Sequence, residues 1–365
     1  MSDVTATTEE QAGVLVEKLF GQTLAWLELS TVYVGAALGL YETLAEKGPL
    51  NAQGLAEGAG IAERYAREWL EQQAVAGIIE VDDPASSESE RRYTLPEAHQ
   101  SVLTDPESPF SMSGPAWLPG SFARALPSLL DAYRTGRGVP LSEYGEEFVI
   151  AQALFNRPAY THLLADEWLA AVPEIRGRLD AEPPARVADV ACGAGWSSIA
   201  LARAFPKISV DGIDLDEASI TTARKNAAEA GVTDRVNFEV RDAADSQLAG
   251  QYDVVFLFEA LHDMSRPVDV LRALRDLSAA DGTVIVVDEK VADEFMAPGD
   301  EIERFMYSAS VLHCLPVGMA DQPSAATGTV LRTSKLREYA TDAGWSDVEV
   351  LPIEADFFRF YRLVG

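Results

Sequence analysis

Three side chains in the C-terminal half of the chain could move a proton or bind a metal ion. His262 and Asp263 are adjacent, and His313 follows much later in the sequence. An imidazole has an unperturbed pKa of about 6.5 and can accept a proton near neutral pH, so His262 is a candidate general base. Two histidines and one carboxylate also form the donor set of many non-haem iron sites. Acid–base chemistry and metal chemistry therefore both stay open here, and a third interpretation is that His313 simply lines a pocket.

A second group of residues has the pattern of a nucleoside site. Gly193 and Gly195 fall at the predicted turn between a strand and a helix, within the run Asp189–Trp196. At such a turn a ligand can contact the backbone and the free N–H groups of the helix. Asp214 ends the next predicted strand, where a carboxylate accepts both ribose hydroxyls. The sequence therefore predicts that this turn binds a nucleoside.

The kind of nucleoside follows from two details of the same turn. A dinucleotide-binding turn needs Gly or Ala at its third position, and Ser198 stands there. Asp189, shortly before Gly193, would repel a pyrophosphate and attract an ammonium group. S-Adenosylmethionine has an ammonium group and a ribose but no phosphate. It is favoured over NAD, which leaves an NAD-dependent oxidoreductase as a weaker alternative.

From residue 185 to about residue 290 the chain resembles the class I S-adenosylmethionine-dependent methyltransferases. Their first motif is acidic-x-Gly-x-Gly-x-Gly, which Asp189, Ala191, Gly193 and Gly195 match with alanine in place of the first glycine. Asp214 follows as it does in that family. The resemblance implies that S-adenosylmethionine is the cofactor and that these five residues bind it.

The same resemblance implies further cofactor contacts beyond the first motif. Asp242 and Ala243 follow the third predicted strand, where the family's aspartate contacts the adenine amino group. Leu215 would cover one face of the adenine. Phe258, at the end of the fourth predicted strand, completes the predicted cofactor site.

Leu261-His262-Asp263 is similar to a tripeptide of the small-molecule O-methyltransferases that carry an N-terminal winged-helix dimerisation domain. In that family the histidine is the general base, and an acidic residue ending the fifth strand orients it. Asp288 falls at that position, whereas Leu331 replaces the family's second acidic residue. The resemblance implies O-methylation of a small apolar or aromatic acceptor, with His262 and Asp288 as catalytic residues.

A second resemblance is to the metal-dependent 2-oxo-acid C-methyltransferases such as phenylpyruvate C-methyltransferase. These enzymes use a His-Asp pair and a distant His, which His262, Asp263 and His313 match. This resemblance implies a divalent or ferric metal ion that holds the enolate of a 2-oxo acid for methylation at carbon.

Alternating strands and helices over residues 181–365 would position all of these side chains. Short apolar strands separated by longer helices indicate βαβ units, a parallel sheet and a doubly wound, Rossmann-like α/β domain. A final hairpin at 345–350 and 356–363 would close the sheet. The predicted strands are 186–190, 208–214, 235–241, 252–258 and 283–288, and the predicted helices are 196–205, 216–230 and 266–279.

Residues 1–105 are predicted to form a winged-helix-like domain. Helices at 11–46, 52–58 and 63–76 precede two short strands at 78–81 and 92–95. The apolar surface of the first helices predicts a homodimer through this domain. Residues 106–180 are expected to form a helical connector or lid, with a helix over 157–179 broken at Pro173.

The charge of the chain limits its partners. Its 29 Lys and Arg against 58 Asp and Glu give a net charge of −29. Residues 1–105 hold six basic and eighteen acidic residues, which disfavours a winged-helix transcriptional regulator with a vestigial ligand domain. We expect a small-molecule acceptor rather than nucleic acid or a membrane. The two cysteines and an acidic N-terminus predict a cytoplasmic protein.

Overall fold

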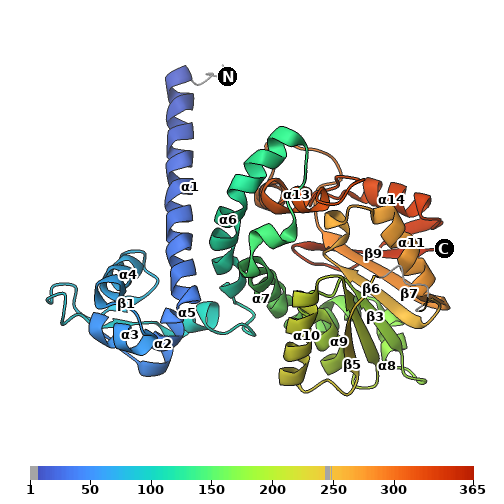
Figure 1. The fold of residues 1–365 in the computed structure, drawn as a ribbon, viewed down its shortest axis with the longest axis horizontal. Coiled ribbons are helices and arrows are strands. Elements are labelled where there is room, and N and C mark those ends of the chain that lie inside the picture. Colours follow the sequence, from blue (N-terminus) through green and yellow to red (C-terminus); the bar gives the residue numbers. More distant parts are fainter. Residues whose placement is uncertain (1–6, 243–246, 248) are drawn as a thin grey trace, which may run out of the picture. The chain divides into compact units, whose positions relative to one another are not determined.

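The chain divides into two compact units, Met1–Ser121 and Phe122–Gly365, in the computed structural model (Figure 1). The structure describes residues 7–242, 247 and 249–365. The N-terminal unit is mainly helical, whereas the C-terminal unit is built on a seven-stranded sheet.

Helices and a short hairpin follow one another in the N-terminal unit in the order of a winged helix. Its core consists of nearly inaccessible side chains, among them Tyr41, Leu55, Trp69 and Tyr93. The predicted helices and wing are confirmed, although each wing strand is only two residues long. The elements are α1 (Thr8–Ala37), α2 (Leu40–Lys47), α3 (Ala52–Ala59), α4 (Glu63–Val75), β1 (Glu80–Val81), β2 (Tyr93–Thr94) and α5 (Glu97–Leu103).

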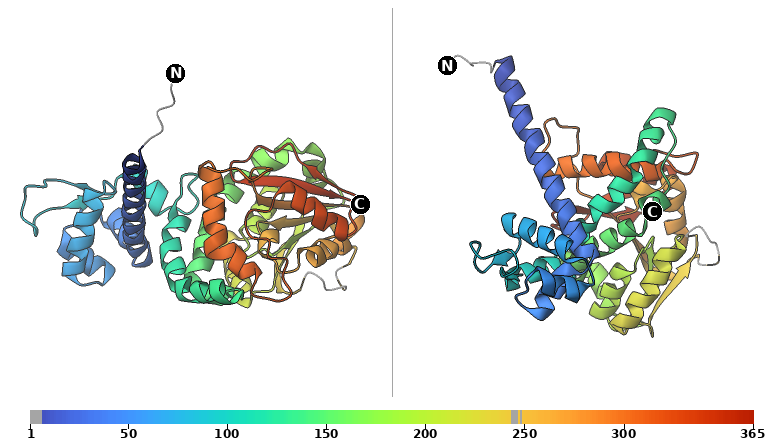
Figure 2. Two further views of the ribbon diagram at one scale, coloured as in Figure 1. Left: turned by 90° about the horizontal axis from the view of Figure 1, so that it is seen from above. Right: turned by 60° about the vertical axis from the view of Figure 1, so that its left-hand side comes forward.

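The first helix, α1, is long and mostly exposed (Figure 2). It begins at a capping box, in which the Thr7 hydroxyl accepts from the Glu10 N–H and the Glu10 carboxylate accepts from the Thr7 N–H. Of its 30 residues, Val32 and Gly35 are buried. Within the described residues no single helix is long and apolar enough to cross a membrane, although α1 and α2 together, bent by 64°, have the length and composition to do so.

The helices that precede the sheet differ from the predicted ones. α6 (Ser113–Thr135) is followed by a 3₁₀ turn η1 (Leu141–Tyr144), α7 (Glu146–His162), a π-helical turn η2 (Leu164–Trp168), a 3₁₀ turn η3 (Leu169–Ala171) and α8 (Pro173–Asp180). The predicted helix over 157–179 therefore has wrong bounds, because α7 begins at Glu146 and ends at His162, but the predicted break at Pro173 is confirmed. Pro173 begins α8, because a proline at the first helical turn loses no hydrogen bond and its fixed φ suits the helix.

Seven strands form the sheet in the order β5-β4-β3-β6-β7-β9-β8. β3 to β7 pair in parallel, and β9 lies antiparallel between β7 and β8. The predicted Rossmann-like sheet and its closing hairpin are confirmed. The strands are β3 (Arg186–Val190), β4 (Ser209–Asp214), β5 (Val236–Val240), β6 (Tyr252–Phe258), β7 (Ser278–Glu289), β8 (Asp347–Val350) and β9 (Phe358–Val364).

Helices cover both faces of this sheet (Figure 2). Successive strand residues point to opposite faces, so Phe256 packs with α8, α9 and α10, whereas Val255 packs with α11 and α14. A further helical segment follows β7 and precedes α14. These elements are α9 (Trp196–Ala204), α10 (Glu217–Ala230), a 3₁₀ turn η5 (Leu261–Asp263), α11 (Pro267–Leu277), α12 (Glu301–Ala309), a π-helical turn η6 (Ser310–Cys314), α13 (Leu315–Gly318) and α14 (Thr333–Asp342).

One strand begins earlier than predicted. β7 starts at Ser278, which pairs with Tyr252, and the register then shifts so that Val254 pairs with Thr283. The intervening residues carry Asp281 and Gly282, a turn-like pair that the sequence pattern excluded from the strand. The ladder resumes beyond them and carries β7 to Glu289.

Candidate active site

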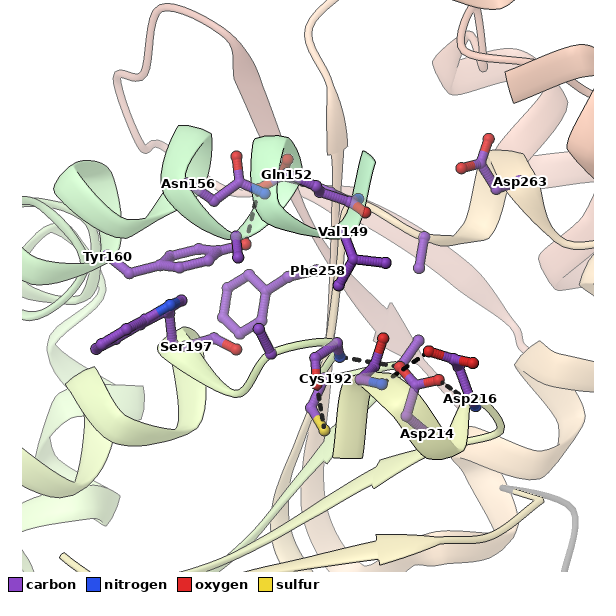
Figure 3. A pocket seen from close by; sticks show the side chains of 18 of the residues that line it. Val149, Gln152, Asn156, Tyr160, Cys192, Ser197, Asp214, Asp216, Phe258 and Asp263 are labelled. Carbon is purple, nitrogen blue, oxygen red and sulfur yellow. Dashed lines mark hydrogen bonds between the residues drawn. The ribbon is translucent and has the colours of Figure 1, made fainter. Parts of the chain in front are cut away.

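A cavity lies at the carboxyl ends of the neighbouring strands β4, β3 and β6, and α7 forms one of its walls (Figure 3). Ligands of open parallel sheets bind at this edge, where the strand order reverses. Four carboxylates line the cavity, those of Asp214, Asp216, Glu259 and Asp263. Because none of the described lining residues is Lys or Arg, the cavity suits a cationic ligand.

The turn after β3 places its backbone against this cavity. Ala191, Gly193 and Gly195 have φ of 56°, 51° and 80°, in the left-handed region that glycine tolerates best. A Cβ on Gly195 would lie 2.5 Å from the Phe238 ring, whereas a Cβ on Gly193 would meet no atom within 4 Å. Gly195 therefore permits close packing of the turn, and Gly193 leaves space for a ligand.

Asp214 is held in position by the same turn. Its Oδ2 accepts from the Gly193 N–H and its Oδ1 from the Asp216 N–H, each at 2.9 Å. Each oxygen keeps a further lone pair, so the carboxylate can still accept the two ribose hydroxyls. Burial raises the pKa of Asp214, partly offset by these backbone hydrogen bonds.

Asp189 lies behind the turn rather than in the cavity wall. It is fully buried, and its Oδ2 accepts from the hydroxyls of Ser197 and Ser198 at 2.6 and 2.5 Å. Burial raises its pKa to about 6. Asp189 thus joins β3 to the start of α9 and is not among the residues lining the cavity.

The structure separates the remaining predicted cofactor-binding residues into one that lines the cavity and others that do not. Phe258 lines the cavity and stacks on Phe256 with ring centroids 5.1 Å apart. Leu215 is 73% exposed and Asp242 is exposed, and neither lines the cavity. Ala243 lies outside the described residues. The adenine contacts of these three residues stay predictions.

α7 supplies lining residues that the sequence did not single out. Val149, Gln152, Ala153, Asn156 and Tyr160 share one face of the helix and line the cavity (Figure 3). Their helical spacing is the signal that could have identified them. It went unused because the predicted helix began only at residue 157, beyond four of these five positions.

His262 lies on η5, directly after β6, and is 2% exposed. Its Nδ1 is 2.9 Å from Oδ1 of Asp288 and 3.5 Å from Oε2 of Glu289, both at the end of β7. Its Nε2 is 3.3 Å from Oδ1 of Asp263, which lines the cavity. The structure therefore brings the two predicted catalytic residues, His262 and Asp288, together at the edge of the cofactor cavity.

The surroundings of His262 favour its protonated form. Burial lowers the pKa of His262, but the carboxylates of Asp288, Glu289 and Asp263 outweigh burial and raise it well above 6.5. Burial also raises the pKa of Glu289 well above its usual value. A hydrogen bond to the fully buried Asp288 orients the imidazole.

His313 approaches the same group from η6. Its Nδ1 is 4.0 Å from Oδ2 of Asp263, and its ring stacks on Phe148 with centroids 3.8 Å apart. Burial lowers the pKa of His313 to about 4, so that the ring is neutral near pH 7. Its neighbour Cys314 is a buried free cysteine that forms no disulfide. Burial raises the pKa of the Cys314 thiol to about 12.

The predicted metal donors are close together but do not form one compact set. Ligand atoms of His262, Asp263 and Cys314 lie within 4.8 Å of one another, as do those of His262, Asp288 and Glu289. In the described part of the chain, no group of this kind includes His313. Cys314 is a candidate ligand that the sequence analysis did not include.

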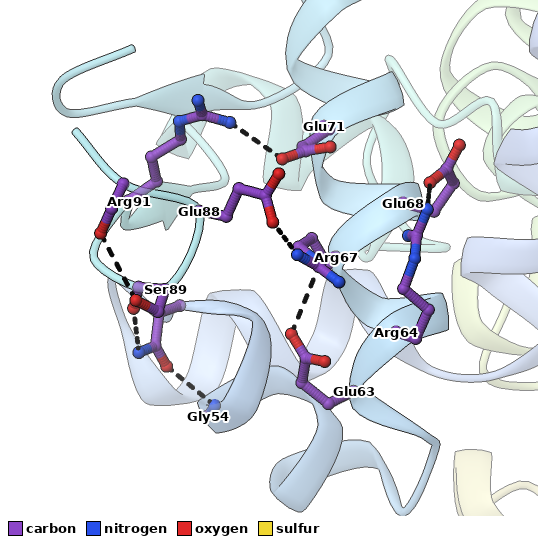
Figure 4. Close-up of polar contacts among 11 residues, drawn as sticks. Gly54, Glu63, Arg64, Arg67, Glu68, Glu71, Glu88, Ser89 and Arg91 are labelled. Carbon is purple, nitrogen blue, oxygen red and sulfur yellow. Dashed lines mark hydrogen bonds and ion pairs between the residues drawn. The ribbon is translucent and has the colours of Figure 1, made fainter. Parts of the chain in front are cut away.

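Basic side chains of the winged helix are engaged in ion pairs within it (Figure 4). On α4, Arg64 pairs with Glu68, and Arg67 pairs with Glu88 and, at 3.7 Å, with Glu63. In addition, Arg91 on the wing pairs with Glu71 at 2.9 Å. The two arginines of α4, the helix that would enter a DNA groove, are therefore neutralised by glutamates of the same domain.

Two family models match the chain. One, described as a methyltransferase domain, matches residues 182–339, and the other, described as an Rv2258c-like winged HTH domain, matches residues 27–105.

Curated relatives of the chain include methyltransferases, and the chain spans about half the length of the first of them. It is 27% identical over 169 residues to a release factor glutamine methyltransferase of Rhodopirellula baltica. The matched region covers 42% of this chain and 56% of that protein. It is 35% identical over 180 residues to a ubiquinone biosynthesis O-methyltransferase of Pseudomonas paraeruginosa. Here the matched region covers 49% of this chain and 72% of that protein.

Solved structures share the fold over nearly the whole chain. The mitomycin 7-O-methyltransferase has a TM-score of 0.70 at 19% identity, covering 97% of this chain and 99% of that one. Human N-acetylserotonin methyltransferase, solved with S-adenosylmethionine, also has a TM-score of 0.70, at 18% identity and with coverage of 99% and 100%. With the two family models and the Pseudomonas relative, this fold shows that the chain belongs to the class I S-adenosylmethionine-dependent methyltransferases, with a winged-helix domain preceding the methyltransferase domain.

Proposed function

We propose that the protein transfers a methyl group from S-adenosylmethionine to a hydroxyl oxygen of a small apolar or aromatic acceptor. The observation that carries this proposal is the position of the His262–Asp288 pair, which follows β6 and ends β7, directly beside the cavity at the ends of β4, β3 and β6. When bound, S-adenosylmethionine supplies the electrophilic methyl group.

His262 acts as the general base in this proposal. Its Nδ1–H donates to Asp288, which leaves Nε2 to accept the proton of the acceptor hydroxyl as the oxygen attacks. Nε2 faces Asp263, a residue of the cavity wall, so the acceptor hydroxyl would enter beside Asp263. Gly193 and Asp214, which also line the cavity, would hold the nucleoside.

Aromatic side chains next to this group support an apolar or aromatic acceptor. Phe148 stacks on His313, and the Tyr144 ring meets His313 edge-on at 4.7 Å. A second aromatic group joins α7 to α12, with Phe155 parallel to Phe305 at 6.4 Å. Rings of this kind bind a flat apolar molecule through stacking and edge contacts.

The test is methyl transfer in the presence of a chelator. The purified full chain is incubated with S-adenosylmethionine labelled at the methyl carbon, together with a panel of phenols, and products are identified by mass spectrometry and NMR. We expect a labelled methyl group on oxygen, formed equally well with and without the chelator. Methylation of a 2-oxo acid at carbon, abolished by the chelator, would contradict the proposal.

A second candidate function is metal-assisted C-methylation of a 2-oxo acid. Two buried atoms favour it, because Asp263 Oδ1 and His313 Nε2 have no hydrogen-bond partner among the described residues. A neutral imidazole and a carboxylate suit iron or another divalent or ferric ion. His262, Asp263 and His313, with Cys314 nearby, would hold the metal, and the metal would act as a Lewis acid on the acceptor.

The partners and location of the protein are part of the same proposal. We infer that it works as a cytoplasmic homodimer, joined through the apolar side chains exposed on α1. Paired arginines on α4 support a structural rather than a DNA-binding role for the winged helix.

A further inference from the structure

Glu259 occupies an unusual position in the cavity wall. It is the first residue after β6 and has φ of 53°, a left-handed conformation that is costly for a residue with a side chain. Its N–H donates to the Val287 carbonyl, which fixes the backbone at this point. The backbone at Glu259 is therefore held in a costly conformation, with the side chain in the cavity wall.

Two residues of α7 hold the Glu259 side chain. The Tyr160 hydroxyl donates to Oε1 at 2.7 Å, and the Asn156 side chain also hydrogen-bonds to the carboxylate. Burial raises the pKa of Tyr160 well above 10, so that Tyr160 remains a donor. All three residues line the cavity, and Figure 3 labels Asn156 and Tyr160.

The carbonyl oxygen of the Asn156 side chain is a buried acceptor that could bind a ligand. Asn156 is only 8% exposed, and its Oδ1 has no hydrogen-bond partner among the described residues. A buried acceptor without a partner costs about 1–3 kcal/mol, so such atoms are usually satisfied by a ligand or water. Asn156 Oδ1 offers a hydrogen-bond acceptor to an ammonium group. Burial raises the pKa of the neighbouring Glu259 to about 7, and a cation beside it would favour its ionised form.

The order of the strands identifies which ammonium group this is. Asp214, the proposed ribose ligand, ends β4, and Glu259 follows β6, with the turn after β3 between them. Suppose that a nucleoside places its ribose at Asp214 and extends across this turn. The end of the molecule that lies farthest from the adenine then reaches Glu259. In S-adenosylmethionine that end is the amino acid, whose ammonium group carries a positive charge.

From the sequence alone, Asp189 is the carboxylate predicted to attract the ammonium group of the cofactor. Its Oδ2 accepts from two serine hydroxyls. Its Oδ1 has no hydrogen-bond partner among the described residues, but the whole side chain is buried behind the turn. Glu259 lines the cavity, whereas Asp189 does not.

We propose that Glu259 and Asn156 bind the α-ammonium group of the cofactor's methionine moiety, with Tyr160 positioning Glu259. The proposal rests on S-adenosylmethionine being the cofactor, as the proposed function requires. It makes Glu259 the main source of the cavity's selectivity for the complete amino acid end of the cofactor.

Calorimetric titration with three adenosine ligands tests whether Glu259 binds the ammonium group or only maintains the shape of the cavity. S-Adenosylhomocysteine carries the ammonium group without the sulfonium charge. Its deaminated analogue lacks the ammonium group, and 5′-methylthioadenosine lacks the whole amino acid. We expect wild-type protein to bind S-adenosylhomocysteine at least about tenfold more tightly than the deaminated analogue, as a charge-assisted hydrogen bond requires.

Variants assign the effect to the named side chains. Glu259→Gln should weaken S-adenosylhomocysteine binding about tenfold or more while changing the affinity for the deaminated analogue and methylthioadenosine less than twofold. Asn156→Ala should give the same pattern with a smaller loss, and Glu354→Gln, at an exposed carboxylate, should change nothing. Thermal unfolding of each variant checks that it folds.

Two outcomes would overturn the proposal. One is equal wild-type affinity for S-adenosylhomocysteine and its deaminated analogue, a comparison that needs no variant. The other is an equal loss of affinity for all three ligands in Glu259→Gln, which would mean that Glu259 only maintains the shape of the cavity. If the ammonium preference is found but no methyl group reaches an oxygen acceptor, the proposed function fails while this assignment stands.

Discussion

At the scale of single residues, one buried and two partly buried carboxylates surround the imidazole of His262, and His313 approaches one of them. Asp288, Glu289 and Asp263 all approach His262 within 3.5 Å. A base in such surroundings is well oriented, but it must lose a proton before it can accept one from the acceptor. The carboxylates therefore strengthen His262 as a base and shift its useful pH range upwards.

Replacement of His262 should separate catalysis from binding. We expect His262→Asn to lower the rate of methyl transfer about 10²–10⁴-fold, because the acceptor hydroxyl loses its base. Calorimetry should show unchanged affinity for S-adenosylhomocysteine. His162→Ala, which removes an exposed histidine of α7, serves as the matched control. A variant of His262 with the wild-type rate would contradict its role as the base.

The rate of transfer should rise with pH across the neutral range. Burial lowers the pKa of His262, but its three carboxylate neighbours raise it well above 6.5, and the protonated ring cannot accept a proton. A pH profile of kcat/KM at saturating cofactor would show this ascending limb. A rate that is already maximal at pH 6 would argue against proton transfer to His262.

Asp189 should make the free energy of unfolding depend on pH. Its folded-state pKa of about 6 lies above the unfolded value, so its stabilising effect is complete below about pH 4 and is lost as the pH rises through 6. Relative to wild type, Asp189→Asn should gain up to about 3 kcal/mol between pH 4 and pH 7. Denaturant unfolding measures this, with the exposed Asp281→Asn as control. A pH-independent difference would contradict the shift.

At the scale of elements, the turn between β3 and α9 has two separable functions. Gly195 allows the turn to pack against Phe238, and Gly193 leaves the cavity open. We expect Gly195→Ala to lower the melting temperature strongly, because its Cβ would lie 2.5 Å from the Phe238 ring. Gly193→Ala should cost about 1 kcal/mol of stability for its positive φ and should abolish S-adenosylhomocysteine binding. Equal effects of the two substitutions on melting temperature would contradict this division.

Which parts of the site could be predicted depends on the element that carries them. Gly193, Asp214 and His262 follow short apolar strands, and period-two patterns and turn glycines indicate where such strands end. Tyr160 and Asn156 lie on α7, which begins at Glu146 without a side-chain cap and contains Pro158. Their contact with Glu259 spans a long sequence separation, which no local pattern encodes.

The same limit applies to the geometry of η5. Sequence indicated that His262 and Asp263 would lie at the sheet edge, but adjacent side chains in a strand point in opposite directions. The 3₁₀ turn brings Nε2 of His262 to 3.3 Å from Oδ1 of Asp263. The resemblance to the O-methyltransferases places Asp288 at the end of the fifth strand, and β7 does run parallel beside β6.

At the scale of the whole molecule, α1 has more apolar surface than a monomer would leave exposed. Phe20 is 71% exposed, and Leu19, Trp26 and Leu27 are each 53% exposed. A contiguous apolar face of this kind usually marks an interface. A second copy of the same helix is the partner that we expect.

Light scattering on the full chain tests this expectation. We expect wild-type protein to be dimeric and the double variant Leu19→Glu, Phe20→Glu to be weakened about a hundredfold or more in self-association, since each buried side chain contributes about 1.5–3 kcal/mol. Val75→Glu, at a position on α4 that is 90% exposed, should leave the dimer intact. A monomeric wild-type chain would rule out this interface.

The carboxylates of the cavity wall affect how the protein discriminates between its cofactor and other cellular nucleotides. ATP and NADP share adenine and ribose with the cofactor and are abundant, but their phosphates would lie towards Glu259 and Asp263 in a wall where no described residue is Lys or Arg. Electrostatic repulsion should keep these nucleotides out even at large excess. The enzyme should therefore keep its full rate in millimolar ATP, so that its output would follow the supply of methyl donor and not the energy state of the cell.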